Sequence, residues 1–297
     1  MSVNKQTIET AFKELQDSIC SSLSEIDGKS FKEDKWDRPG GGGGRTRVLL
    51  GNIIEKGGVN FSAVEGATPT KILDALKLEK SNFYATGVSI VLHPHNPNIP
   101  IIHMNIRYFE MNNGTWWFGG GIDLTPHFVV KEDAHFFHNQ LKNTCDQFDP
   151  TFYTDYKKWA DDYFYIPHRK ETRGIGGIFF DRLNDKNTPL TKEKLFDFVL
   201  AVVNTFAPTY IELIKKNQSK KITPEKKDWQ YLRRGRYAEF NLVYDKGTKF
   251  GLETDGRIES ILMSMPPMAK WEYNHTLTND ESATSDLLRK GIDWVKK

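Results

Sequence analysis

Hydrophobic residues near the start of the chain recur at steps of three and four, which is the spacing of one face of an amphipathic helix. The spacing holds from Ile8 to Leu23, with polar residues between the apolar ones, and Asp27-Gly28 then interrupts it. Glycine directly after the last periodic residue is a common helix end. The pattern therefore predicts an N-terminal helix over about residues 4–26.

From Phe83 the pattern changes to a period of two, with β-branched and aromatic residues in alternation, which is typical of strands. It predicts three strands over residues 83–93, 101–110 and 115–123. A proline-rich connection joins the first two strands, and an Asn-Asn-Gly turn joins the last two. Because both connections are short, we expect an antiparallel meander.

The remaining segments alternate between helical and strand patterns. Helical periodicity recurs at residues 131–147, 150–164, 191–216 and about 280–296. Thr223 followed by Pro224 starts one further, short helix. Strand patterns cover residues 45–62 (broken at Gly51 and at 57–58), 174–181, 236–245, 248–253 and 257–263. Residues 39–44, rich in glycine, are expected to form a flexible loop. The mixture predicts an α+β protein with one large antiparallel sheet.

Charge and cysteine content narrow the functional classes. The chain has 297 residues, and 41 Lys and Arg against 39 Asp and Glu give a net charge of +2. This balance argues against a strongly basic nucleic-acid-binding protein. Its two cysteines, Cys20 and Cys145, cannot form a four-thiolate metal site or a disulfide framework. We therefore expect a reducing compartment and no nucleic-acid partner.

No segment is predicted to direct the chain to a membrane. The first residues contain no apolar signal core. The most apolar stretch, residues 196–214, is interrupted by Asp197 and Glu212, so it falls short of the ~18 uninterrupted apolar residues of a span. The sequence therefore predicts a cytoplasmic protein without a membrane span.

Candidate chemistry lies on one face of the predicted meander, because alternate residues of a strand share a face. The odd-numbered positions include Ser89, His103, Asn105, Arg107 and Asp123, with glycines at 119 and 121. Glycine leaves room for a ligand to approach the backbone. This face is therefore typical of a pocket wall for a flat molecule, and simple solvent exposure is the alternative.

Arginines gather beside glycines in several segments. Guanidinium groups bind carboxylates and phosphates as a fork, so together they indicate a small ligand with several negative charges. Each arginine taken alone also fits a solvated surface residue. Two nucleotide-binding motifs are excluded, since residues 40–44 lack the P-loop ending and residues 174–177 lack the dinucleotide spacing. The arginines are Arg45, Arg47, Arg169, Arg173, Arg233, Arg234, Arg236 and Arg257.

Several histidines form a candidate metal site, because imidazole nitrogens bind divalent metals. His93 and His103 flank the connection between two predicted strands. His135 and His138 lie one turn apart on a predicted helix, and His168 follows the next helix. No established metal-binding spacing supports the site, so structural or surface histidines are the alternative.

Nine segments between Trp36 and Tyr273 resemble the oxygen-dependent coproporphyrinogen-III oxidases, the aerobic enzymes of haem biosynthesis. The matching motifs are long and far more specific than a lone glycine signature. They cover residues 36–45, 87–97, 102–110, 116–126, 158–164, 168–169, 173–181, 232–252 and 257–267.

The resemblance implies a fold, a reaction and an assembly. The fold is a single α+β domain over residues 1–297, with a large flat antiparallel sheet between helices. The reaction is the oxidative decarboxylation of two propionates of coproporphyrinogen III to vinyl groups, which yields protoporphyrinogen IX, CO2 and hydrogen peroxide. O2 is the oxidant, no organic cofactor is expected, and the assembly is a homodimer.

The resemblance also assigns roles to individual residues. His103 matches the family's proton donor, and Asp123 and Arg173 match residues proposed to act at the tetrapyrrole. Substrate contacts fall on Ser89, Asn105, Ile106, Arg107, Asp255, Gly256 and Arg257. For Asp123 a helix N-cap is the structural alternative, because Asp123-Leu-Thr-Pro is expected to precede a helix.

Two questions stay open at the level of sequence. Some relatives bind a metal through histidines that match His93, His103, His138 and His168, whereas others need none, so a divalent metal is one of two alternatives. His135 competes with His138 as the functional helix histidine. A non-catalytic tetrapyrrole carrier and a metal-dependent oxygenase are the alternative functions.

Overall fold

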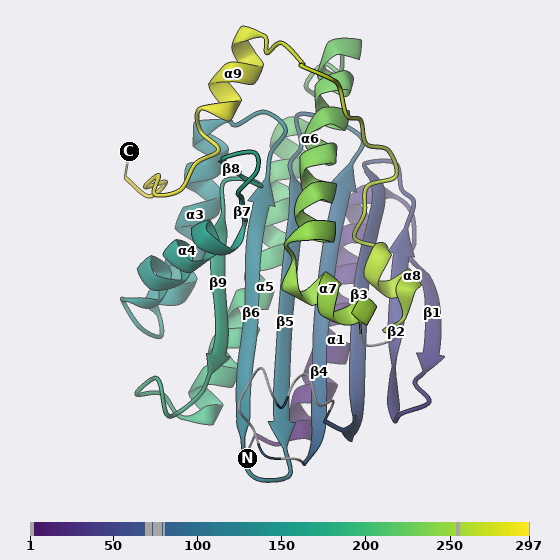
Figure 1. Cartoon of the computed structure of the whole chain (residues 1–297), viewed down its shortest axis with the longest axis vertical. Coiled ribbons are helices and arrows are strands. Elements are labelled where there is room, and N and C mark those ends of the chain that lie inside the picture. The colour runs from purple at the N-terminus through teal and green to yellow at the C-terminus, as the bar shows by residue number, and fades with distance from the viewer. Residues whose placement is uncertain (1–2, 69–72, 74–78, 80, 254–255, 297) are drawn as a thin grey trace.

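A seven-stranded sheet forms the centre of the protein, whose computed structural model describes residues 3–68, 73, 79, 81–253 and 256–296 (Figure 1). Neighbouring strands are antiparallel throughout, in the order β1-β2-β3-β4-β5-β6-β9. The strands are β1 Lys32–Asp37, β2 Gly42–Leu49, β3 Ile54–Ala67, β4 Asn82–Pro94, β5 Ile101–Met111, β6 Trp116–Thr125 and β9 Gly177–Leu183; β7 Tyr165–Ile166 and β8 Glu171–Thr172 form a separate hairpin. The predicted meander is confirmed as β4, β5 and β6.

Helices cover both faces of this sheet. They are α1 Lys5–Asp27, α3 Lys131–Asp146, α4 Phe152–Tyr163, α5 Lys192–Asn217, α6 Pro224–Val243, α7 Lys246–Glu253, α8 Ile258–Leu262 and α9 Asn279–Ser285. On one face α1 packs on β3 and β4 and α5 on β5 and β6, whereas α6, α7 and α8 lie over the other face, and α4 packs along the edge strand β9 (Figure 1). The predicted α+β class is confirmed.

The N-terminal helix forms as predicted, because its signals agree at both ends. The Asn4 side chain accepts a hydrogen bond from the backbone N–H of Thr7 and caps the first turn. Gly28 ends the helix with a φ of 79°, in the left-handed region that favours glycine. The apolar face from Ile8 to Leu23 is buried in the core.

The main core lies between α5 and the even-numbered side of the meander. Ile90, Met104 and Ile106 on the strands are fully buried, as are Phe198 and Val202 on α5. The polar odd-numbered positions therefore face away from this core, toward α6. The alternation predicted from the sequence is confirmed.

The predicted strands between residues 236 and 263 are wrong, because this segment is helical. α6 runs from Pro224 to Val243, and Arg234, Tyr237 and Asn241 recur at helical spacing along one buried face. The helices α7 and α8 follow. The β-branched and aromatic residues of this segment favour a strand locally. The helix forms because residues at every third or fourth position are buried, and this spacing fits one face of a helix.

The glycine run is only in part the predicted loop, because residues 39–41 form the turn between β1 and β2. Gly42, Gly43 and Gly44 belong to β2 and pair with β3, and Gly43 and Gly44 also pair with β1. A Cβ on Gly44 would lie 2.2 Å from the ring of Trp36, so the missing side chain leaves space for that indole. The predicted break at residues 57–58 lies inside β3, and the predicted C-terminal helix ends early, at Ser285.

The long helix α5 meets the length and composition of a membrane span, contrary to the expectation from its interrupted sequence. It is the one such helix in the part of the chain that the structure describes, with a mean hydropathy of 1.3 over its most apolar window. That window is 56% buried, and its apolar residues belong to the main core. Packing inside the protein therefore accounts for its apolar character.

A candidate active site on the polar face of the sheet

Strand register brings the predicted polar residues into adjacent rows on one face. His103 on β5 lies opposite Asp123 on β6, and Asn105 lies between Ser89 on β4 and Gly121 on β6. Arg107 likewise lies opposite Gly119. The shared face predicted from odd-numbered positions is confirmed. Ile106 is the exception among the predicted contacts, because its side chain is fully buried on the opposite face.

Asp123 forms the centre of a buried ionic cluster. Arg173 Nη2 donates to both carboxylate oxygens at 2.8 Å, and His103 Nδ1 lies 2.7 Å from Oδ1. The side chains of Asp123 and Arg173 are only 1% and 2% exposed. Arg173 also donates to the Asn241 side chain on α6 at 2.7 Å, so three separate segments hold the carboxylate in place.

The electrostatics of this cluster keep Asp123 ionised. Burial alone would raise the pKa of Asp123, but the Arg173 charge and the His103 hydrogen bond outweigh it and hold that pKa below its ordinary value. Burial likewise opposes the charge of Arg173, yet Asp123 raises the pKa of Arg173 above its usual range. The cluster is therefore a fixed ion pair that orients His103.

Asp123 does not act as a helix cap. The next helix, α3, begins at Lys131, and its N-cap residue is Val130. Asp123 lies inside β6, and its carboxylate faces His103 and Arg173. The capping alternative is therefore wrong.

Arg107 forms a second ion pair on the same face. Its Nη2 donates to Asp181 Oδ1 on β9 at 2.8 Å, and its Nη1 donates to Asn105 Oδ1 at 3.1 Å. Both partners of the pair are half-exposed, in contrast to the buried Asp123 and Arg173. A Cβ on Gly119 would lie 2.6 Å from Asp181 Oδ1 and 2.8 Å from Arg107 Nε, so this glycine makes the pair sterically feasible.

The predicted substrate segment 255–257 is not brought to these clusters. Arg257 forms an ion pair with Asp34 on β1 and lies 5.9 Å from the ring centre of Trp36. β1 is the edge strand of the sheet opposite β9. Gly256 packs against Ile261 of α8, and Asp255 lies outside the described residues.

The four candidate metal ligands have separate environments. His93 is buried, and its Nε2 contacts the Ser264 carbonyl at 2.9 Å. His138 is buried on the core side, where both ring nitrogens are hydrogen-bonded, to the Tyr153 hydroxyl and the Ile175 carbonyl. Burial lowers the pKa of both His93 and His138 to about 3. His103 is already held by Asp123.

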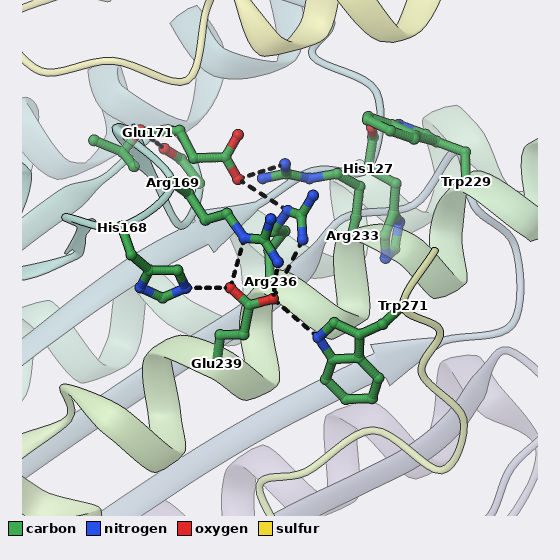
Figure 2. Close-up of polar contacts among 11 residues, drawn as sticks. His127, His168, Arg169, Glu171, Trp229, Arg233, Arg236, Glu239 and Trp271 are labelled. Atoms are coloured by element: carbon green, nitrogen blue, oxygen red, sulfur yellow. Dashed lines mark hydrogen bonds and ion pairs between the residues drawn. The ribbon is translucent and has the colours of Figure 1, made fainter. Parts of the chain in front are cut away.

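The remaining histidines do not complete a metal site. His168 is exposed, and its Nε2 lies 2.6 Å from Glu239 (Figure 2). Its Nδ1 lies 2.6 Å from the Tyr244 hydroxyl. His135 contacts the Trp294 carbonyl. Over the described residues, no group of three or more His, Cys, Asp or Glu side chains is arranged to hold a metal. The four-histidine set therefore does not fit a metal centre in this conformation.

Glu239 on α6, which the sequence analysis did not single out, joins three segments (Figure 2). Its carboxylate accepts hydrogen bonds from Arg169 at 2.7 and 2.9 Å and from Trp271 Nε1 at 2.9 Å, as well as from His168. These donors tie the β7–β8 hairpin and the 264–278 segment to α6. Because Arg173 directly follows β8, the Glu239 cluster also supports the Asp123 site.

We expect acid to weaken this cluster in a defined pH range. Burial opposes the Glu239 charge, but hydrogen bonds from Arg169, His168 and Trp271 outweigh it and lower the pKa of Glu239 to about 2. The pKa of Glu239 is lower in the folded state than in the unfolded state. Its contribution to the free energy of unfolding is therefore present above pH ~4.5 and is lost as the pH falls toward ~2. Glu239→Gln should flatten this part of the pH dependence of the unfolding free energy.

Denaturant unfolding at several pH values between 3 and 6 measures the effect. Glu132→Gln, at an exposed glutamate on α3, is the control for the loss of one negative charge. An equal slope in wild type and Glu239→Gln would contradict the assignment.

Comparison with known proteins agrees with the resemblance of the motifs. The model of the coproporphyrinogen III oxidase family matches residues 7–294. The chloroplastic coproporphyrinogen-III oxidase 1 of Arabidopsis thaliana is 51% identical over 284 residues, covering 90% of this chain and 72% of that protein. The oxygen-dependent enzyme of Drosophila melanogaster is 45% identical over 98% of this chain and 78% of its own length. The mitochondrial enzyme of Homo sapiens is 47% identical over 98% of this chain and 67% of its own length.

Proposed function

Because the chain belongs to the coproporphyrinogen III oxidase family, we infer that it oxidises coproporphyrinogen III with O2 in haem biosynthesis. The observation that carries the chemistry is the buried pair of Asp123 and Arg173 beside His103, on a face lined by glycines. The relatives are oxidases by name, which favours this function over that of a tetrapyrrole carrier.

Electrons and atoms balance without a further reactant. Each of two propionates becomes a vinyl group as CO2 leaves, and two hydrogens with two electrons pass to O2, which forms hydrogen peroxide. In our proposal the negative charge of Asp123, which is buried beside the partly exposed His103, stabilises positive charge as the ring loses electrons. His103 is oriented by Asp123 through Nδ1, so its Nε2 exchanges the proton at the substrate.

Aerobic turnover tests this function. Reduced coproporphyrinogen III incubated with the protein under air should give protoporphyrin fluorescence after oxidation of the product, with no conversion under argon. Binding of the tetrapyrrole without conversion under air would instead support the carrier. Turnover by protein freed of small molecules tests the prediction that no organic cofactor is needed.

A metal is not part of the proposed mechanism. The four candidate histidines do not fit a metal centre, as their contacts show, so no step is derived through one. Thorough chelation should leave the turnover rate unchanged. Loss of activity that returns with a divalent metal would support the metal-dependent oxygenase.

Arg107 is proposed to anchor a substrate propionate, because it lies on the polar face beside Asn105 and is half-exposed. Arg107→Ala should cost roughly 1.5–3 kcal/mol of substrate affinity, the typical contribution of a charge-assisted hydrogen bond. This corresponds to a rise in KM of roughly 10- to 150-fold. Steady-state kinetics measure it, and unchanged KM and kcat in a folded variant would exclude the role.

A homodimer through the C-terminal half is the proposed assembly. The end of α6, together with α7 and α8, carries five exposed apolar residues, an exposure typical of an interaction surface. They are Leu242, Val243, Phe250, Leu252 and Ile258. Val243→Asp should shift the mass at micromolar concentration from dimer to monomer. A fully active wild-type monomer would contradict the assembly.

The compartment remains a prediction. Relatives are named as chloroplastic and mitochondrial, and others come from bacteria, so the family occupies several compartments. A cytoplasmic location is proposed from the sequence, and fractionation of the source cell tests it.

A further inference from the structure

We propose that Asp181 is an exchangeable partner of Arg107, which a substrate carboxylate displaces and which returns to Arg107 when that carboxylate is lost. The inference rests on the proposed function, because it requires a substrate with more carboxylates than its product. It assigns Asp181 a part in discriminating between the two.

The first argument is the contrast between two ion pairs on one face. Asp123 and Arg173 are 1% and 2% exposed, and neighbours on several segments hold them. Asp181 and Arg107 are 32% and 37% exposed. Partly exposed pairs are weak, so a second carboxylate can compete for the same guanidinium. The first pair is therefore permanent and the second exchangeable.

The second argument is the geometry of the guanidinium. Arg107 Nη2 bonds one carboxylate oxygen of Asp181, and Nη1 bonds Asn105. Carboxylates bind arginine best with both oxygens on two parallel N–H groups. The single bond to Asp181 is thus a weaker arrangement than a bidentate propionate could make. Both side chains lie over Gly119, whose missing side chain makes room for them, and both are partly exposed to an incoming carboxylate.

The third argument is the space beside Asp181. It borders a cavity of about 270 Å³ that is also lined by Asn187 and Thr188, so a displaced carboxylate has polar surroundings. Asp149 and Asp155 line the same cavity. Their like charges disfavour a carboxylate there, and this favours the return of Asp181 to Arg107.

The exchange follows from the charge change of the reaction. Each decarboxylation removes one carboxylate from the tetrapyrrole, and a guanidinium that had bound it would be left without an anion. Asp181 supplies that anion from within the site. Substrate therefore binds in competition with Asp181, whereas product without a carboxylate at this position does not.

Equilibrium binding of two stable porphyrins tests the exchange. Coproporphyrin III keeps all four propionates, and protoporphyrin IX keeps two; both are fluorescent and unreactive here. Asp181→Asn should lower the Kd for coproporphyrin III by roughly 2- to 5-fold, the range expected when a weak, partly exposed ion pair is removed as competitor. The Kd for protoporphyrin IX should stay unchanged.

Two controls separate exchange from a general charge effect. Asp185→Asn removes an exposed carboxylate four residues after Asp181, whereas the side-chain partners of Arg107 are Asp181 and Asn105, so it should change neither Kd. In an Arg107→Ala background, Asp181→Asn should no longer affect coproporphyrin III, because a double-mutant cycle isolates the coupling between the two residues.

The outcomes are distinct. The exchange is overturned if Asp181→Asn binds coproporphyrin III no more tightly than wild type, or if it binds both porphyrins more tightly by the same factor. The proposed function stays intact in either case, provided that the wild-type protein turns over coproporphyrinogen III. A wild-type chain that neither turns over the substrate nor binds either porphyrin overturns the proposed function and the exchange together.

Discussion

Asp123→Asn should lower kcat by roughly 10²- to 10⁴-fold, the usual loss for a group that acts on protons or charge in the transition state. The substitution keeps the shape and one acceptor oxygen but removes the negative charge between Arg173 and the substrate face. It also leaves the Arg173 charge buried without its partner, so the free energy of unfolding should fall by about 3–5 kcal/mol. Rates measured well below the melting temperature separate the two effects.

His103→Asn is the matched variant for this prediction. It removes the imidazole but leaves the Asp123–Arg173 pair in place, and the His103 side chain is 20% exposed. It should therefore lose activity with little change in melting temperature. Normal turnover by Asp123→Asn would exclude a catalytic role for the carboxylate.

Arg173→Met should produce a large loss of stability that depends on pH. Without the guanidinium, burial becomes the main influence and raises the pKa of Asp123 above its wild-type value. The unfolding free energy should fall by about 3–5 kcal/mol at neutral pH, because an ionised carboxylate stays buried without its main partner. The deficit should shrink as the pH falls, since a protonated carboxyl no longer needs the pair.

The same variant should change the pH dependence of residual activity. If catalysis uses ionised Asp123, the acid side of the pH–rate profile moves to higher pH, because the carboxyl holds its proton longer. Arg173→Lys, which restores the charge, should move both properties back toward wild type. Equal melting-temperature deficits at pH 5 and pH 8 would contradict the coupling between Arg173 and Asp123.

Sequence alone predicted the parts of the fold in which local pattern and tertiary environment agree. The meander is one example. The alternation that predicts its strands also places apolar residues on the core face and polar residues on the other face. The shared face of His103, Arg107 and Asp123 could therefore be predicted. The N-terminal helix is another, since Asn4 and Gly28 cap it with the side chain and backbone that those ends require.

The errors arose where long-range packing outweighs local preference. The segment after Tyr237 has strand-like residue types, yet the burial of Tyr237 and Asn241 beside Arg173 fixes it as helix. The partners Asp181, Glu239 and Asn241 were missed for related reasons. Their contacts join elements that are distant in the sequence. Only Asn241 could have been found from the sequence, because it lies at helical spacing from Arg234 and Tyr237.

The arrangement of α5 has a consequence for how the chain folds during synthesis. The meander that ends at Thr125 leaves the ribosome before α5, which begins at Lys192 and covers the apolar side of β5 and β6. Until then the nascent sheet exposes a surface that is fully buried in the mature protein. Contacts between segments that are distant in the sequence form slowly, and a chain that exposes apolar surface in the meantime is prone to aggregate. Chains that stall before residue 217 should therefore depend on chaperones and collect in the insoluble fraction.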